Sequence, residues 1–221
     1  IGNVGSLEAS RKDTKEWRKH SFTILLGILG WSFLGRSDVL LLGFLVSPAE
    51  VAAYFICLRL AEILTFFSGV SYYVWGGEIS NLVQEDKWER VQYILTRSSQ
   101  LCCSATLIIA CFGFIYAEHI LAFVNDSYQP YAFIFRGALL AFFLKGASGI
   151  LNPMYYIIGQ QDFLAKCQWA IGLCFLASVL LTVPSYGITG CLIAFVVWQA
   201  AYVLTLGIRL KVKHNLSILP I

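Results

Sequence analysis

Long apolar segments alternate with short polar ones from about residue 21 to residue 210. Each segment approaches the roughly 20 residues that a helix needs to cross a bilayer. The six segments run from about 21 to 45, 51 to 75, 101 to 123, 131 to 156, 163 to 183 and 187 to 210. This pattern predicts an all-α fold, a bundle of six transmembrane helices at 21–210, with a cytoplasmic linker at 1–20 and a cytoplasmic tail at 211–221.

Composition points to the same class of protein. Of the 221 residues, 58% are hydrophobic and 13% are charged, and the mean hydropathy is +0.70. So little polar surface suits a chain in lipid rather than one in water. We therefore expect an integral, multi-pass membrane protein without a soluble domain. The polar stretch 1–20 lacks the apolar core of a signal peptide, and we expect it to link this chain to an upstream part of a longer protein.

Basic residues are unevenly distributed between the two sides of the predicted bundle. Twelve of the 16 precede the first span, separate the second from the third or the fourth from the fifth, or follow the last: Arg11, Lys12, Lys15, Arg18, Lys19, Lys87, Arg90, Arg97, Lys166, Arg209, Lys211 and Lys213. The opposite turns at 46–50, 124–130 and 184–186 contain no Lys or Arg. Because cationic loops stay cytoplasmic during insertion, we expect both termini in the cytoplasm. We expect the bundle itself in the inner (plasma) membrane.

We single out six charged residues inside the apolar spans, since a charge there is costly and indicates a functional site. Four are basic and two acidic: Arg36, Arg59, Arg136, Lys145, Asp38 and Glu62. The excess of two positive charges favours an anionic guest in a water-filled cavity.

Helix geometry limits which of these charges can share a cavity. Arg136 and Lys145 are nine positions, and so about 180°, apart, so that an unkinked helix directs only one of them to a given side. We favour Lys145, because Arg136 is close enough to the outer boundary for its side chain to reach the headgroups. Arg36 and Asp38 are about 200° apart, so one of them is expected to line a cavity while the other packs against a neighbour. The sequence does not determine which of the two lines the cavity and which packs against a neighbour.

Arg59 and Glu62 have a structural alternative. Three positions apart on a helix, they can form an ion pair that neutralises itself against a neighbouring helix.

Three local patterns predict details of the helices. Ser47 and Glu50 can form a capping box at the start of the second helix. Asn152-Pro153 is expected to kink the fourth helix near its cytoplasmic end. The stretch 87–101 carries apolar residues at helical spacing among charges, as expected for an extension that lies on the membrane surface.

Small residues and thiols are assigned to packing. Five glycines are candidates for a close approach of helices, although glycine is also simply common in membrane helices: Gly27, Gly30, Gly35, Gly146 and Gly149. The seven cysteines all lie in predicted spans, form no CxxC pair and are treated as small apolar residues: Cys57, Cys102, Cys103, Cys111, Cys167, Cys174 and Cys191. We expect no metal site, no cofactor and no nucleic-acid partner.

Three stretches carry a resemblance to a known family. Residues 36–54 read RSDVLLLGFLVSPAEVAAY and continue into LRLA at 58–61, and residues 186–194 read YGITGCLIA. Residues 152–162 contain Gly159-Gln160 after an apolar helix. In these stretches the chain resembles the polysaccharide and O-antigen (lipid-linked oligosaccharide) flippases of the multidrug, oligosaccharidyl-lipid and polysaccharide exporter superfamily. It departs from them at Cys191, where a smaller residue is usual, and at the end of the fifth span, which lacks the family's frequent Asn.

The resemblance covers about 18–213 and implies the second, C-terminal bundle of a 12–14 helix exporter. It implies that polyprenyl-pyrophosphate-linked oligosaccharide is flipped across the cell membrane for polysaccharide and lipopolysaccharide biosynthesis. The partners would be that substrate, membrane lipids, the missing N-terminal bundle and polysaccharide polymerase machinery. Arg59, Lys145 and Arg36 are then the expected substrate-binding residues, and Glu62 or Asp38 is expected to couple transport to an ion gradient.

Other classes of protein stay open at this point. A cation-coupled drug exporter of the same superfamily would share the fold but should carry excess acid in its cavity. A membrane-embedded enzyme of lipid-linked sugar metabolism usually needs a larger outer loop than 124–130, so no enzyme is expected. A non-transporting membrane protein would tolerate substitution of Arg59 and Lys145. For a flippase, we expect one bundle alone to be unstable or inactive.

Overall fold

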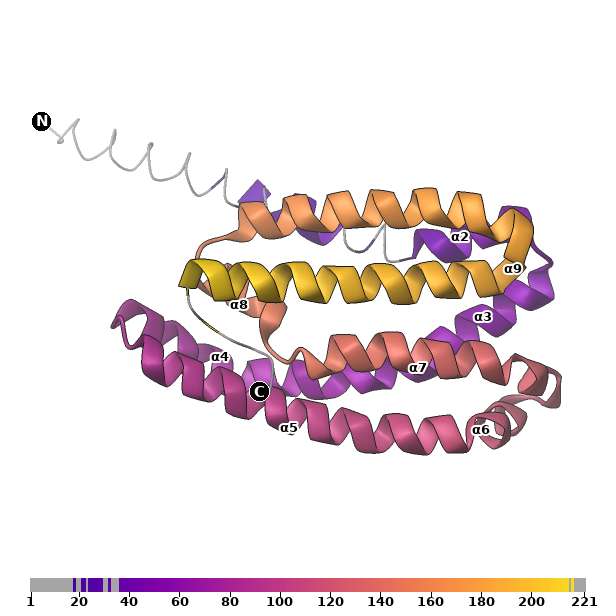
Figure 1. The fold of residues 1–221 in the computed structure, drawn as a ribbon, viewed down its shortest axis with the longest axis horizontal. Helices are drawn as coiled ribbons and strands as arrows, with labels where there is room; N and C mark the ends of the chain where they lie inside the picture. Colours follow the sequence, from indigo (N-terminus) through magenta and orange to yellow (C-terminus); the bar gives the residue numbers. More distant parts are fainter. Residues whose placement is uncertain are drawn as a thin grey trace, which may run out of the picture.

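The fold is entirely helical over the part of the chain that the structure describes. The structure is a computed structural model that describes residues 18, 21–22, 24–29, 32, 36–214 and 216. Its elements are α2 (Ser37–Leu45), α3 (Pro48–Ala61), η1 (Glu62–Thr65), α4 (Phe66–Gln84), α5 (Trp88–Ile115), α6 (Ala117–Val124), η2 (Asp126–Tyr131), α7 (Ala132–Ala147), α8 (Leu151–Ile157) and α9 (Gln161–His214) (Figure 1). The predicted all-α class is confirmed. The linker at 1–20 lies outside the described residues except for Arg18, as do Gly30 and Gly35. Of the predicted tail at 211–221, residues 211–214 continue α9 and most of the others are not described.

Four helices among the described residues are long and apolar enough to cross a membrane. They are Pro48–Gln84, Trp88–Ile115, Asp126–Ile157 and Gln161–His214. These helices match the membrane protein that the composition predicts. The count differs from six because only part of the predicted span at 21–45 is described, and because the last two predicted spans form one element, α9.

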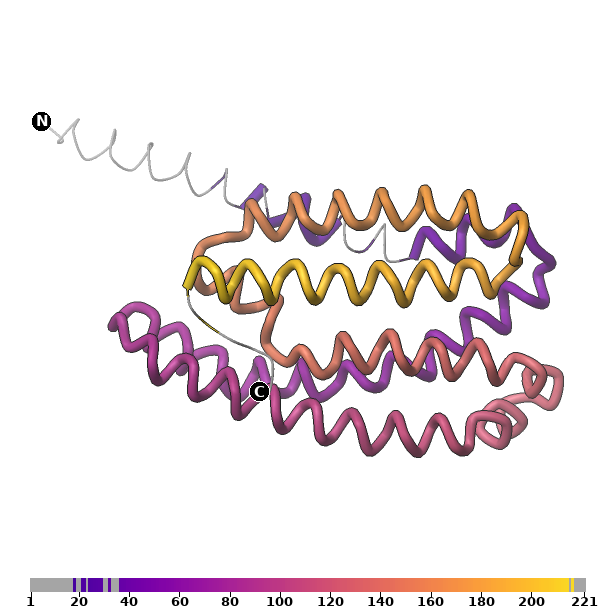
Figure 2. The backbone as a smooth tube through the Cα atoms, viewed as in Figure 1, coloured from indigo at the N-terminus to yellow at the C-terminus, as the bar shows by residue number. Residues whose placement is uncertain are grey.

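The long element α9 reverses direction at Gly187. This residue has φ 57° and ψ −145°, a backbone conformation outside the helical region that glycine adopts without a side-chain clash. The chain turns back there, so residues 161–186 form a first leg and 188–214 a second leg that lies beside it (Figures 1 and 2). Gly190 lets the legs meet, since a Cβ on it would lie 2.8 Å from the Thr182 carbonyl oxygen. The turn predicted from sequence at 184–186 is next to the observed reversal.

Between α3 and α4 the helix narrows into one 3-10 turn, η1. The span Pro48–Gln84 begins with the predicted capping box: Ser47 Oγ accepts from the Glu50 backbone N–H, and Glu50 Oε2 accepts from Ser47 N.

At Gly146 the helix α7 crosses η1, where a Cβ would lie 2.5 Å from the Leu64 carbonyl oxygen. The predicted close approach is thereby confirmed at Gly146, whereas a Cβ on Gly27 would make only ordinary contact with Ala165, at 3.5 Å.

The break in the fourth predicted span lies in the turn before Pro153. Helix α7 ends at Ala147, and Gly149 adopts φ 57° in the turn before α8. Pro153 is the third residue of α8, where the missing backbone N–H has no helical partner to lose. The fourth predicted span is thus interrupted in the turn that Pro153 crowds, since a proline clashes with the carbonyl four residues before it, here that of Gly149. The predicted kink is present as a full break of the helix.

The stretch 87–101 does not form a separate surface helix. It is continuous with the third predicted span in α5, which has 28 residues and so is about 42 Å long. Val91 and Leu95 are buried against residues of α4, α8 and the second leg of α9, among them Met154 and Leu206. The apolar stripe was predicted correctly, but it packs into a protein core instead of lying on lipid.

Candidate functional site

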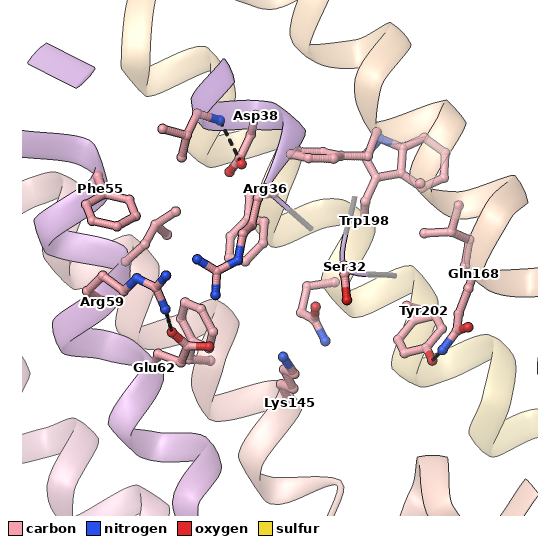
Figure 3. A pocket seen from close by; sticks show the side chains of 18 residues that line it. Ser32, Arg36, Asp38, Phe55, Arg59, Glu62, Lys145, Gln168, Trp198 and Tyr202 are labelled. Atoms are coloured by element: carbon pink, nitrogen blue, oxygen red, sulfur yellow. Dashed lines mark hydrogen bonds and ion pairs between the residues drawn. The ribbon is translucent and has the colours of Figure 1, made fainter. Parts of the chain in front are cut away.

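A cavity of about 320 Å³ lies among α2, α3, η1, α7 and both legs of α9. Five of the six charged residues found in the predicted spans line it: Arg36, Asp38, Arg59, Glu62 and Lys145 (Figure 3). They come from segments far apart in the sequence, and folding brings them to one place. The structure thus assembles every residue that the sequence singled out for substrate binding or ion coupling, and their roles stay predictions.

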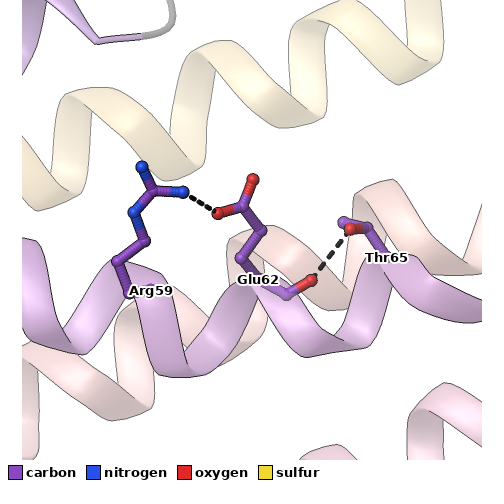
Figure 4. A network of polar contacts seen from close by, with 3 residues as sticks. All are labelled: Arg59, Glu62 and Thr65. Carbon is purple, nitrogen blue, oxygen red and sulfur yellow. Dashed lines mark hydrogen bonds and ion pairs between the residues drawn. The ribbon is translucent and has the colours of Figure 1, made fainter.

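Arg59 and Glu62 form an ion pair at one side of the cavity. Arg59 Nη1 lies 2.7 Å from Glu62 Oε2, and the Arg59 guanidinium lies 5.0 Å from the centre of the Phe55 ring. The side chains keep 38% and 43% of their surface exposed, so the pair faces open space (Figure 4). The self-neutralising pair that the spacing allowed is present. Since Arg has five N–H donors, the pair leaves others available to a guest.

Glu62 is the first residue of η1, and this 3-10 turn fixes the position of the Glu62 backbone. The Thr65 hydroxyl donates to the Glu62 backbone oxygen at 2.8 Å, within the single 3-10 turn (Figure 4). A 3-10 stretch inside a long helix is a common place for a functional hinge.

Lys145 points into the cavity from α7. Its Nζ lies 5.6 Å from the centre of the Phe142 ring, and the Glu62 carboxylate attracts its ammonium group. Arg136, nine residues earlier, lies outside the cavity, where Nη2 pairs with Glu118 Oε1 at 3.2 Å and Nε donates to the Phe114 carbonyl oxygen at 3.2 Å. The opposite directions of Lys145 and Arg136 agree with the prediction from helix geometry.

Glu118 changes the charge balance that the sequence indicated. It lies near the end of the third predicted span and was not counted, yet it pairs with Arg136. Because Arg136 and Glu118 both lie outside the cavity, the cavity has three basic and two acidic residues, an excess of one positive charge instead of two. The sign of the excess is unchanged.

Arg36 and Asp38 both line the cavity, contrary to the expectation that only one would. Arg36 is the residue before α2 and has φ −131° and ψ −1°, so the rotation of 100° per residue does not apply to it. Asp38 is 1% exposed, and its carboxylate accepts hydrogen bonds from the Tyr54 hydroxyl at 3.0 Å and from Val39 N at 2.8 Å. Since Arg36 lies outside the regular helix, both side chains can reach the same cavity.

A buried hydrogen-bond chain gives Asp38 a structural role as well. The Tyr54 hydroxyl donates to Asp38 and accepts from the Cys191 thiol at 3.4 Å, joining α2, α3 and the second leg of α9. Tyr54 and Cys191 are fully buried. Of the two predicted coupling residues, Glu62 is thus the more open to the cavity and Asp38 the more tightly held.

Replacing Tyr54 by phenylalanine should destabilise the protein. The change leaves the Asp38 carboxylate without its side-chain donor, at a cost of about 1–3 kcal/mol. We expect a lower thermal unfolding temperature in detergent. Tyr73→Phe is the control, because Tyr73 on α4 is 86% exposed and should be neutral. Equal unfolding temperatures for the two variants would contradict a stabilising role for the Tyr54 bond.

Uncharged polar side chains of α9 also line the cavity, beside apolar ones such as Phe175, and were not predicted from sequence. Gln168 and Gln199 are 6% and 8% exposed. Gln168 Nε2 donates to the Tyr202 hydroxyl at 3.3 Å, which donates to Asn152 Oδ1 at 2.8 Å. Gln168 Oε1 and Gln199 Nε2 have no hydrogen-bond partner in the described part of the protein. A buried polar atom without a hydrogen bond costs about 1–3 kcal/mol of stability. Amides in apolar spans were the signal that could have found them.

The thiols fit a packing role. All seven cysteines are free, and Cys57, Cys102, Cys167 and Cys191 are buried. Within the described ranges, no three His, Cys, Asp or Glu side chains are grouped so as to hold a metal ion.

Comparison of this chain with protein-family models, with curated proteins and with solved structures found no match. The fold defines a helical protein of membrane-spanning type, and any function has to be argued from the cavity.

Proposed function

We propose that this chain is one bundle of a flippase that moves a polyprenyl-pyrophosphate-linked oligosaccharide from the cytoplasmic to the outer leaflet of the cell membrane. The cargo would serve cell-surface polysaccharide biosynthesis, as for O-antigen. The observation that carries the proposal is the cavity itself: three cationic side chains and two carboxylates gathered among apolar helices. Charges in such a place are costly and are typical of a substrate or ion path.

The three cations suit a pyrophosphate. A guanidinium can bind phosphate oxygens through two parallel N–H donors, and an ammonium acts as a compact point charge. Arg59 and Lys145 are the proposed phosphate contacts, with Arg36 as a third. All three line the cavity, and in Figure 3 Arg36 lies between the Arg59 side and Lys145. A polyprenyl tail would stay in the bilayer beside the helices.

Six spans remain our proposal for the topology. A straight helix of 54 residues would be about 80 Å long, roughly twice a bilayer with its headgroups. The reversal at Gly187 divides α9 into two legs of about 40 Å, each long enough to cross. With a span at 21–45, this supports six helices and two cytoplasmic termini. A second bundle, supplied by the N-terminal half of the exporter, would rock against this one and open the cavity to each side in turn.

Cargo of the opposite charge is the main competing proposal. The two carboxylates of the cavity would suit a cationic drug, but one is paired with Arg59 and the other is buried against Tyr54. The excess of one positive charge favours an anion.

A binding comparison separates the two cargo classes. The protein, with its partner bundle, would be held in lipid nanodiscs and titrated with undecaprenyl pyrophosphate and with a lipophilic quaternary ammonium. We expect saturable binding of the pyrophosphate that weakens with salt, and no competition by the cation. Tighter binding of the cation would replace this proposal with a drug exporter.

Glu62→Gln should make transport insensitive to a proton or sodium gradient. A carboxylate that faces the cavity can bind the coupling cation, and the amide cannot. Initial rates would be measured in liposomes with and without an imposed gradient. Asp38→Asn is the comparison, since Asp38 is held by Tyr54 and Val39. Unchanged gradient dependence in Glu62→Gln would exclude Glu62 as the coupling residue.

A further inference from the structure

We infer that the cavity has two walls of different chemistry and that its α9 wall binds the uncharged, hydroxyl-rich part of the guest, the sugar that adjoins the phosphate. This inference rests on the proposed function and assigns an orientation to the cargo within the same site. The α9 wall is defined by Gln168, Trp198, Gln199 and Tyr202.

Charged and uncharged polar groups are separated across the cavity. In Figure 3 the Arg59–Glu62 pair lies on one side and Lys145 below, whereas Gln168, Trp198 and Tyr202 lie on the other side. A guest that presented only phosphate would need the first side alone. The second side has hydrogen-bonding groups without charge, which match hydroxyl and acetamido groups.

The amides of this wall have hydrogen-bonding capacity that the protein does not use. Gln199 Nε2 and Gln168 Oε1 are buried without a partner among the described residues, and each side chain is more than nine-tenths buried. Buried polar groups nearly always find a partner. One amide offers a donor and the other an acceptor, and a sugar hydroxyl can be both.

The aromatic residues of the wall complete a surface for a sugar ring. The Trp198 Nε1 hydrogen is already donated to Ser178 Oγ at 2.8 Å, so Trp198 presents its ring to the cavity instead of its N–H. An aromatic face carries partial negative charge and attracts polarised C–H groups. Tyr202, 3% exposed, is held by Gln168 and Asn152.

The size of the cavity limits what is bound there. About 320 Å³ is at the lower end of the roughly 300–1,000 Å³ of small-molecule sites. The α9 wall therefore recognises the part of the glycan nearest the pyrophosphate, and the remaining sugars extend beyond it.

The test compares two affinities in the same protein. The protein with its partner bundle, in nanodiscs, would be titrated with undecaprenyl pyrophosphate and with four derivatives that carry glucose, galactose, N-acetylglucosamine or N-acetylgalactosamine. We expect at least one derivative to bind about tenfold more tightly than the sugar-free lipid. Gln199→Met, of similar length but without the amide, should reduce that ratio to near one. Gln168→Met serves as the second variant should Gln199→Met not fold.

Two controls separate the possible failures. Gln92→Met, on α5 and outside the cavity, should keep the tenfold ratio, and Lys145→Gln should weaken both ligands about equally. If no lipid binds to folded protein, the proposed function fails and this inference fails with it. If the sugar-free lipid binds but no derivative binds more tightly, or if Gln199→Met and Gln168→Met keep the ratio, waters satisfy the amides and this inference alone is overturned.

Discussion

Lys145→Ala should weaken binding of a polyprenyl pyrophosphate at least about 30-fold. Removing one partner of a desolvated, hydrogen-bonded charge pair costs about 2–5 kcal/mol, and each 1.4 kcal/mol is tenfold in affinity. Lys145 and Glu62 line the same cavity, so the loss of Lys145 also removes a positive charge that offsets this carboxylate. Arg59→Ala is expected to have a similar effect, because it removes a guanidinium and leaves Glu62 unpaired. Equilibrium titration in nanodiscs would measure both variants.

Arg136→Ala is the matched control. It removes a positive charge from the same helix, nine residues from Lys145, but its side chain pairs with Glu118 outside the cavity. We expect an affinity within about twofold of the unchanged protein. Should Arg136→Ala weaken binding as much as Lys145→Ala, the effect would come from the net charge of the protein and not from the cavity.

Gly146→Val should have the second large effect, on folding and on the cavity together. A Cβ at this position would lie 2.5 Å from the Leu64 carbonyl oxygen and 2.9 Å from Thr106 Cγ2. Because the first of these atoms belongs to the backbone, η1 must move, at a cost of about 1–3 kcal/mol or more. Glu62 is in the same turn. We expect a lower thermal unfolding temperature and weaker pyrophosphate binding.

Gly77→Ala tests whether a side chain added at any glycine would destabilise the protein as Gly146→Val does. Gly77 lies within α4, and nothing lies within 4 Å of the Cβ that the substitution adds. We expect a neutral or slightly stabilising effect. A loss of stability like that of Gly146→Val would show that the crossing of α7 and η1 is not what makes Gly146 necessary.

Features that depend on neighbouring residues were predictable. The capping box of Ser47 and Glu50 and the turn beside Gly187 follow from residue types at fixed spacing. The opposite directions of Arg136 and Lys145 follow from the rotation of a regular helix. Each of these depends on the chain within about one to three turns, which a sequence displays directly.

The predictions and the structure differ where the backbone departs from a regular helix. Arg36 precedes α2 and is not helical, so the rotation rule did not apply. The predicted kink before Pro153 is a full break, because Gly149 takes a positive φ. A proline in a sequence indicates where a helix is disturbed. Glycine is common in membrane helices, and its backbone conformation is not evident from the sequence.

The remaining part of the site depends on contacts between distant segments. The pairing of Arg136 with Glu118 and the gathering of five charges from α2, α3, η1 and α7 need the packed bundle. Gln168 and Gln199 were not predicted, because an uncharged amide in a membrane span costs less than a charge and is a weaker indication of a functional site. Their burial without partners is visible only once both legs of α9 are in place.

The central claim is that this cavity carries an anionic headgroup across the membrane. The most direct test is transfer of a fluorescent polyprenyl-pyrophosphate oligosaccharide between leaflets, in liposomes that hold the chain with its partner bundle. We predict transfer by the unchanged protein and a sharp fall in both Arg59→Ala and Lys145→Ala. Absence of transfer in liposomes shown to hold folded protein, or full transfer in both variants, would contradict the account.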